Sequence, residues 1–156
     1  MIIRKFQKSD AQKVGQLFYD TVHTVNAQDY APELINMWAP DNDEFTRLVS
    51  ACENNVFFVA ERDAIIMGFG DMTHEGHLER LFVHKDFQGQ RIGTLLLQAI
   101  EDAAYDIGLM AITTEASVRA MPFFTSHGFQ TIRILNKKHP YKGLVFTTYK
   151  MKKILI

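Results

Sequence analysis

The chain has 156 residues, a length that suits one domain built around one core. Its 17 Lys and Arg residues nearly balance its 18 Asp and Glu residues, so it lacks the field that gathers nucleic acid or anionic lipid. A single cysteine, Cys52, excludes a disulfide framework within the chain. We expect one domain over residues 1–156, in the cytoplasm, with no secretory leader and no membrane span.

The first third of the chain is predicted to contain one strand followed by helices. Residues 2–6 are β-prone, and Ser9 with Gln12 has the spacing of a capping box at a helix start. Apolar residues then recur every three or four positions, as on the buried face of a helix. Helical segments are therefore expected at 9–25, 33–38 and 43–53, with a break at Ala39-Pro40-Asp41.

The middle of the chain is predicted to form an antiparallel meander. Residues rich in β-branched and aromatic types occupy 56–61, 65–72 and 77–83, with turn residues between them. After a polar loop, the helical pattern from Ile92 to Ile107 ends at Gly108. The remaining elements are expected as a strand at 110–114, a helix at 118–127, and strands at 129–135 and 144–151.

This order predicts an α+β fold with a mixed, mostly antiparallel central sheet flanked by helices. The helical crossover between the fourth and fifth strands makes them parallel neighbours, which we expect to splay at their C-terminal ends. An open sheet holds its ligand at such an opening. The final strands, which include Phe146, Tyr149 and Ile154, are also able to pair across a homodimer.

The segment Gln88-Gly89-Gln90-Arg91-Ile92-Gly93-Thr94 joins the fourth strand to an amphipathic helix. The first amides of a helix have no intrahelical acceptors, so together with the helix dipole they can hold a pyrophosphate. Glycines remove side chains that would keep the phosphate away. On its own such a loop is more often a tight turn, and its context decides the interpretation.

With the strand before it, this loop resembles the acetyl-CoA motif of the GNAT acetyltransferases: Gln or Arg, two variable residues, Gly, one variable residue, and Gly or Ala. Residues 115–129, which include two phenylalanines and end in Gly-Phe, are similar to the strand and helix that follow in that family. The resemblance implies direct transfer of acetyl from acetyl-CoA to an amine in a ternary complex. It implies donor contacts at Leu81, Phe82, Val83, Gln88, Gly89, Gln90, Arg91, Ile92, Gly93, Thr94, Ser117, Phe123 and Phe124.

Two residues depart from the family pattern. Arg91 stands where the motif usually has Gly, so we expect a backbone conformation open to residues with a β-carbon. Its guanidinium either reaches a CoA phosphate or is a solvated loop charge. Phe124 stands where many relatives carry a tyrosine that protonates the leaving thiolate, which leaves the general acid unassigned.

A general base is needed because an amine with a pKa near 10 is protonated at pH 7, and deprotonation costs about 4 kcal/mol. Glu79 is the first candidate and His77 the second. The two-residue period of a strand places both, with Leu81, on one face. The alternatives are an ion pair for Glu79 and a surface position for His77, and Asp71 is a further candidate.

Two other chemistries are disfavoured. Cys52 lies on an apolar helical face, which argues against ping-pong transfer through an exposed thiolate. His74 and His77 are three apart across a turn without supporting ligands, so no metal site is expected.

The acceptor amine is expected near the segment between the first two strands. His23, Asn26, Tyr30 and Trp38 can form an aromatic wall with hydrogen-bonding groups, and the alternative for each is that it anchors the segment on the sheet. The basic stretch 137–143 faces CoA, acceptor or solvent. Two rivals to small-amine acetylation remain: acetylation of a protein amine, and a non-catalytic acyl-CoA-binding module.

Overall fold

A computed structural model describes residues 1–40, 45–138 and 145–156, with side chains in the second range described from Leu48 onward. The predicted helix start at Asp43 and most of the basic stretch 137–143 lie outside these residues. No helix within the described ranges is long and apolar enough to cross a membrane. The elements are β1 (Ile2–Lys5), α1 (Ala11–Thr24), α2 (Pro32–Trp38), α3 (Phe45–Asn54), β2 (Val56–Arg62), β3 (Ile65–Met72), β4 (His77–Val83), α4 (Ile92–Ile107), β5 (Ala111–Ala116), α5 (Met121–Ser126), β6 (Gln130–Lys138) and β7 (Val145–Ile154), with short 3₁₀ turns η1 (Lys8–Asp10), η2 (Asn26–Gln28) and η3 (Lys85–Phe87).

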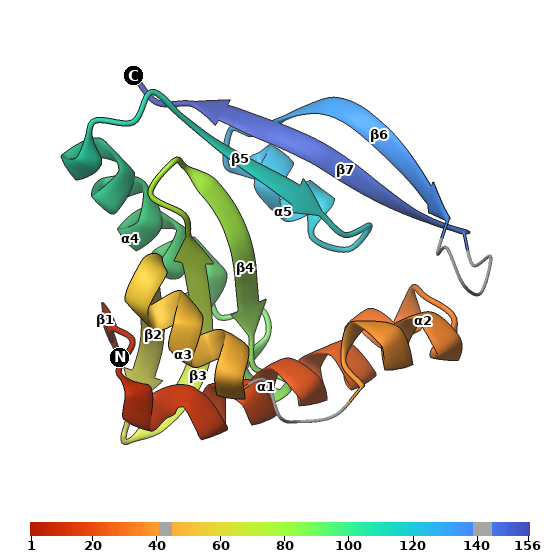
Figure 1. Cartoon of the computed structure of the whole chain (residues 1–156), viewed down its shortest axis with the longest axis horizontal. Helices are drawn as coiled ribbons and strands as arrows, with labels where there is room; N and C mark the ends of the chain where they lie inside the picture. Colours follow the sequence, from red (N-terminus) through yellow and green to blue (C-terminus); the bar gives the residue numbers. More distant parts are fainter. Residues whose placement is uncertain (41–44, 139–144) are drawn as a thin grey trace.

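The strands form one seven-stranded sheet in the order β1-β2-β3-β4-β5-β7-β6 (Figure 1). All neighbouring strands are antiparallel except β4 and β5. These two are paired only at His77 with Thr113 and at Leu78 with Thr114, and beyond these residues they diverge. The predicted α+β fold and the predicted fork between the fourth and fifth strands are both confirmed.

Helices cover the two halves of the sheet differently. α1 and α3 share one apolar cluster with β2 and β3, while α4 packs on the opposite face and α5 against β5 and β7. Gly68 and Gly70 on β3 allow α4 to lie close. A β-carbon on Gly68 would stand 3.0 Å from side-chain atoms of both Ile92 and Leu96, so a larger residue would displace α4 from the fork.

The first helix begins differently from the prediction at Ser9 and Gln12. The Gln7 amide donates to the Asp10 carboxylate at 2.8 Å and closes the turn η1, after which α1 starts at Ala11. Asp10 also accepts two hydrogen bonds from Arg4, at 2.9 and 3.0 Å. The Asp10 carboxylate is thus used by Gln7 and Arg4, and it makes no capping hydrogen bond to α1.

A β-bulge interrupts β4 at the fork. Asp71 is opposite Arg80, but the next residue, Met72, is opposite Leu78, so Glu79 is the extra residue. The amide of Asn55 donates to both Asp71 and Glu79, which places Glu79 and Arg80 on one side of the strand. The expectation that Leu81 shares the face of His77 and Glu79 is therefore wrong, because the bulge reverses the alternation.

Candidate active site

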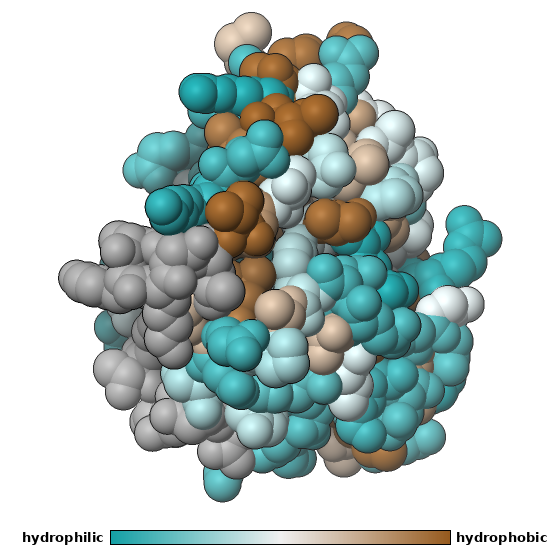
Figure 2. Space-filling view, turned by 90° about the vertical axis from the view of Figure 1, so that its right-hand side faces the viewer, coloured by the Kyte–Doolittle hydropathy of each residue, from teal (hydrophilic) through white to brown (hydrophobic). Residues whose placement is uncertain are grey.

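A cleft of about 720 Å³ occupies the fork between β4 and β5. It has two ends that we name by their residues. The loop end comprises Val83, Gln88, Gly93 and Phe123. The aromatic end comprises Asn26, Tyr30, Trp38, Phe146 and Thr148. Figure 2 views the side of the molecule that carries α2 and the β6–β7 hairpin, where apolar side chains gather in a band bordered by polar residues.

The loop end is held by short-range contacts. The Gln88 side-chain amide donates to the Val83 carbonyl at 2.6 Å, which folds the loop back onto the end of β4. A β-carbon on Gly93 would lie 3.4 Å from the Phe123 ring, so the first turn of α4 is close to α5. This turn brings unsatisfied helix amides to the cleft.

Arg91 is the N-cap of α4 and has φ 66° and ψ 16°, in the left-handed region. Our expectation of a conformation open to residues with a β-carbon is wrong, because Arg91 adopts the left-handed backbone that favours glycine. The conformation costs an L-residue about 1 kcal/mol or more. The Arg91 side chain is exposed and has no partner among the described residues.

Most of the predicted donor residues line the cleft, but not all of them do so. The lining includes Leu81, Phe82, Val83, Gln88, Gly93, Ser117, Phe123 and Phe124. The lining does not include Gly89, Gln90, Arg91, Ile92 and Thr94. The Ile92 side chain is in the core with 1% exposure, so only its backbone is available to a ligand.

His127 is a positioning residue that the sequence analysis missed. One of its ring nitrogens, Nδ1, lies 2.8 Å from the Phe123 carbonyl and therefore carries the proton. Nε2 then accepts from the Thr94 hydroxyl at 3.0 Å, which ties the first turn of α4 to α5. Its position four residues after Phe123 on one helical face was the available signal.

Glu79 lies in the cleft with a side chain that is 43% exposed. Its carboxylate is 3.4 Å from the Asn55 amide and 3.7 Å from the Arg80 guanidinium, both loose contacts. Asp71, by contrast, is fully buried and bonded twice to Arg80, at 2.9 and 2.7 Å. Burial would lower the pKa of Arg80, but hydrogen bonds and charge from Asp71 outweigh it and raise that pKa. Glu79 is thus the freer carboxylate.

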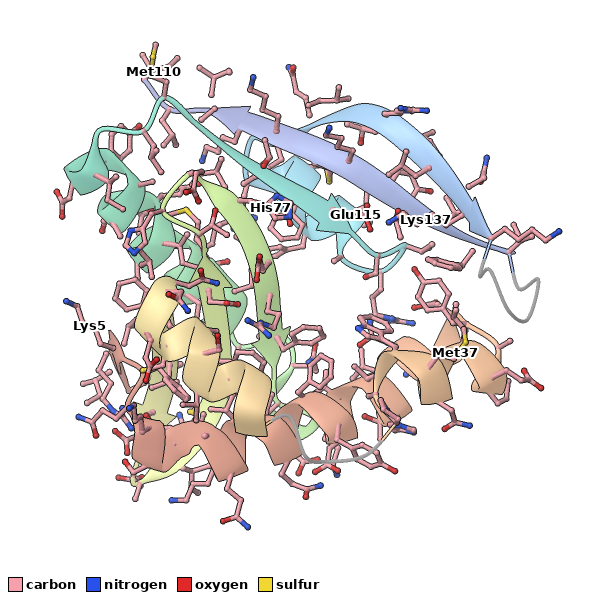
Figure 3. The ribbon with its side chains drawn as sticks, in the orientation of Figure 1. Lys5, Met37, His77, Met110, Glu115 and Lys137 are labelled. Atoms are coloured by element: carbon pink, nitrogen blue, oxygen red, sulfur yellow. The ribbon has the colours of Figure 1, made fainter. Side chains whose placement is uncertain are left out.

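His77 does not line the cleft. It lies at the start of β4 (Figure 3), where Nδ1 is 2.9 Å from the Thr113 hydroxyl. With Glu79 it lines a second hollow of about 510 Å³ on the other side of the fork. The two hollows share Leu78, Glu79, Thr114 and Glu115. Glu79 therefore stands between the two hollows.

The aromatic end unites three of the four predicted acceptor residues, namely Asn26, Tyr30 and Trp38. His23 lies elsewhere: its Nε2 bonds the Ala39 carbonyl at 2.7 Å and its ring stacks on Tyr19. His23 therefore anchors α1 to the end of α2, as the structural alternative proposed.

Two contacts bridge the cleft at this end. The Tyr30 hydroxyl accepts from the Val118 amide at 3.0 Å and donates to the Thr147 carbonyl at 3.4 Å. Burial raises the pKa of Tyr30, the hydrogen bond from Val118 opposes this, and the nearby Asp29 charge adds to it. Arg119 binds Asp29 at 2.8 Å. The segment after α1 is thereby fastened to the β5–α5 loop.

Phe124 and Cys52 take no visible part in proton or acyl transfer. Phe124 is 4% exposed between Phe123 and Phe129 and has no hydroxyl to donate. Cys52 is outside the cleft lining, with its sulfur 3.9 Å from the Phe6 carbonyl. Within the described ranges, no cluster of three or more His, Cys, Asp or Glu residues has an arrangement that could hold a metal ion.

A forked α+β sheet with a glycine loop at one end of its cleft defines a class of nucleotide-cofactor-dependent transferase. The family model of the acetyltransferase (GNAT) domain matches residues 24–153. The chain belongs to the GNAT family and is an acetyl-CoA-dependent acetyltransferase, as the sequence resemblance implied.

Several relatives are similar to this chain over nearly its whole length. The uncharacterized N-acetyltransferase YafP of Escherichia coli is 27% identical over 150 residues, 96% of this chain and 93% of that protein. The uncharacterized N-acetyltransferase MJ1530 of Methanocaldococcus jannaschii is 28% identical over 145 residues, 88% of this chain and 83% of that protein.

Among solved structures, a GCN5-related N-acetyltransferase of Rhodopseudomonas palustris has a TM-score of 0.89 at 25% identity, covering 99% of this chain and 95% of that one. The PaiA N-acetyltransferase of Thermoplasma acidophilum, in complex with coenzyme A, has a TM-score of 0.81 at 17% identity, covering 99% and 98%. YncA of Salmonella typhimurium, in a structure with acetyl-CoA, has a TM-score of 0.77 at 17% identity, covering 100% of this chain and 94% of that one. These likenesses support the fold.

Proposed function

We propose that this enzyme transfers acetyl from acetyl-CoA to the amine of a small molecule, directly and within a ternary complex. The observation that carries the proposal is the position of Glu79. It is a partly exposed carboxylate at the fork, open to both hollows and only loosely contacted by Asn55 and Arg80. Such a group is suited to take a proton from an ammonium ion.

The donor is proposed to bind at the loop end. Beyond Leu78, β4 has no partner on the β5 side among the described residues, so residues 79–83 offer a strand edge to the amide groups of the pantetheine arm. The amides at the start of α4 are proposed to bind the pyrophosphate. The similar PaiA and YncA structures, which contain coenzyme A and acetyl-CoA, support this assignment.

In the proposed reaction, Glu79 accepts a proton from the acceptor ammonium, directly or through one water. The freed nitrogen lone pair attacks the thioester carbonyl carbon. As the C–N bond forms, the C–S bond breaks and CoA leaves as a thiolate. The new amide nitrogen gives up its extra proton to solvent and the thiolate takes one proton from solvent, so the products are the neutral amide and the CoA thiol. A thiolate with a pKa near 8.5 leaves without a strong acid, so Phe124 is tolerated. His77 is the second candidate base, reached from the other hollow.

The bridges at the aromatic end favour a small acceptor over a protein segment. Tyr30 with Val118, and Asp29 with Arg119, cross the cleft where an extended peptide would otherwise lie. The rival of a non-catalytic acyl-CoA-binding module is favoured by one observation, the hydrocarbon side chain of Phe124. Turnover of any amine eliminates that rival.

Replacement of Glu79 by Gln tests the proposal. We expect kcat to fall at least about 100-fold, while calorimetry with acetyl-CoA gives an unchanged Kd. The matched control is Glu115→Gln, which lies in the same cleft but whose carboxylate is bound by Lys137 at 2.6 Å (Figure 3). We expect less than about a threefold change there. Unchanged turnover in Glu79→Gln would move the base to His77, tested by His77→Gln.

A further inference from the structure

The aromatic end contains polar groups that the fold itself does not use. Asn26 is 7% exposed and lines the cleft, yet its side-chain amide has no hydrogen-bond partner among the described residues. The Thr148 hydroxyl, on the opposite wall formed by β7, is the one fully covered side-chain oxygen or nitrogen in the described ranges without a partner. Buried polar groups in native proteins are nearly always bonded, so the Thr148 hydroxyl is an exception, and the Asn26 amide is a second polar group of the same cleft that the fold leaves free for a ligand.

The charges around the cleft are balanced except for one. Arg80 is bound by Asp71 at 2.7 Å. Glu115 and Arg119 are likewise bound, by Lys137 at 2.6 Å and by Asp29 at 2.8 Å. Glu79 is the one charged residue of the described lining without a counter-ion of its own, because its nearest cation, Arg80, is 3.7 Å away and is already bound by Asp71. One surplus carboxylate neutralises one ammonium, so a polycation would bring charges that this site does not compensate.

The rest of the aromatic end is apolar. The rings of Tyr30 and Trp38 meet edge to face with centroids 6.1 Å apart, and the Trp38 ring is 6.2 Å from that of Phe82. Leu34, Met37 and Phe146 complete this wall. Such a lining gains free energy when it covers an apolar or aromatic body.

We infer that the acceptor is a monoamine with an apolar body and one uncharged hydrogen-bonding group, which Asn26 and Thr148 bind while Glu79 receives the amine. This inference rests on the proposed function and deepens it by naming the acceptor class. An amide both donates and accepts, and a hydroxyl does the same, so a hydroxyl on the acceptor satisfies both protein groups.

The test compares amines that differ only in that hydroxyl. The pairs are tyramine with phenethylamine and 5-aminopentanol with pentylamine, and spermidine serves as the polycation. Thiol release should give a kcat/KM at least about tenfold higher for the hydroxylated member of one pair, because a site built to bond a hydroxyl rejects the analogue without it. Spermidine should be slower than that amine. Equal rates within both pairs, or a preference for spermidine, overturn the inference.

Variants of nearly the same shape test whether Asn26 and Thr148 cause the preference for the hydroxylated amine. Asn26→Leu and Thr148→Val should each bring the ratio within the selective pair close to one, because each variant lacks a group that bonds the acceptor hydroxyl. Thr147→Val is the control, because the Thr147 hydroxyl already donates to Asn136 and is outside the cleft lining. An unchanged ratio in Asn26→Leu contradicts the assignment.

A failure of the proposed function is distinguishable from a failure of this inference. If no amine is turned over, the same pairs are titrated calorimetrically into the protein saturated with CoA. If a hydroxylated amine binds more tightly than its partner and this difference is lost in Asn26→Leu, the inferred binding site stands and the proposed enzymatic function is wrong. Equal binding within each pair, or none, would overturn the inference as well.

Discussion

The two ends of the cleft are built by different means. At the loop end, Gln88 binds Val83 only 5 residues away, and the groups offered to the donor are largely backbone, although Gly93 also lies against Phe123. At the aromatic end, Tyr30 contacts residues 88 and 117 positions away along the chain. A site made from backbone amides needs only glycines and a helix start. A site made from side chains needs the whole fold to be correct before its residues meet.

Of the variants that test this difference between the two ends, Gly93→Leu should have the largest effect, and it should act on donor binding. A β-carbon there already meets the Phe123 ring at 3.4 Å, so a branched side chain must enter the cleft at the loop end. We expect acetyl-CoA affinity, measured by calorimetry, to fall at least about 100-fold with little change in Tm, since only the cleft is filled. Gly93→Ala is the graded control and should lose less than about fivefold. Normal donor binding in Gly93→Leu would place the donor elsewhere.

Variants of Arg91 distinguish the effect of its left-handed backbone on stability from the effect of its charge on acetyl-CoA binding. We expect both effects to be of intermediate size. Arg91→Ala keeps the left-handed residue with a β-carbon and removes the guanidinium, so we expect acetyl-CoA to bind about tenfold more weakly, with a smaller dependence on salt. Arg91→Gly should bind like Arg91→Ala but unfold about 3 °C higher, because glycine relieves the left-handed strain. If Arg91→Ala binds like the unchanged protein, the side chain is a solvated loop charge.

Tyr30→Phe should have the smallest effect and should act at the aromatic end alone. Loss of the hydroxyl leaves the Val118 amide unpaired, so we expect a severalfold higher acceptor KM, an unchanged Kd for acetyl-CoA and a Tm lower by about 3 °C. Tyr19→Phe is the control, because the Tyr19 hydroxyl has no hydrogen bond among the described residues. Equal weakening of donor and acceptor would show that the two ends are not separable.

The same variant gives a pH dependence of stability. Burial raises the pKa of Tyr30 in the folded protein above its unfolded value near 10. The folded state therefore retains the phenolic proton longer than the unfolded state does. The stabilisation by Tyr30 is complete below about pH 10 and is lost as the pH rises through the folded pKa. Denaturant titrations between pH 8 and 11 should show the gap between Tyr30→Phe and the unchanged protein narrowing above pH 10.

Local patterns were enough to predict most of the fold. The meander, the helix from Ile92 to Gly108 and the fork after Leu78 follow from periodicity, turn residues and the order of elements. The predicted ends of helices were wrong where a residue far away in the sequence takes up a backbone hydrogen bond. The predicted helix from Val118 begins only at Met121, because the Val118 amide is used by Tyr30 and Ser117 caps the turn through the Ala120 amide.

The site was predictable to the extent that it depends on motif and backbone. Gln88, Gly93 and Phe123 line the cleft, and their contact with the donor stays a prediction. The left-handed conformation of Arg91 and the bulge at Glu79 were not predictable, because no residue type at these positions, such as a glycine, indicates them. Thr148 was missed altogether: it is an ordinary residue in an alternating strand, and only the order in which β7 joins the sheet brings it opposite Asn26.

That order of strands also sets the sequence of events during synthesis. β7 follows β6 in the chain, yet it lies between β5 and β6 and pairs with both. A nascent chain that ends before Val145 can assemble the β1–β4 layer with α4, but it has no strand to connect β5 with β6. The loop that is proposed to bind the donor can therefore form while translation is still in progress. The wall of the cleft that contains Phe146 and Thr148 forms only after β7 has been synthesised.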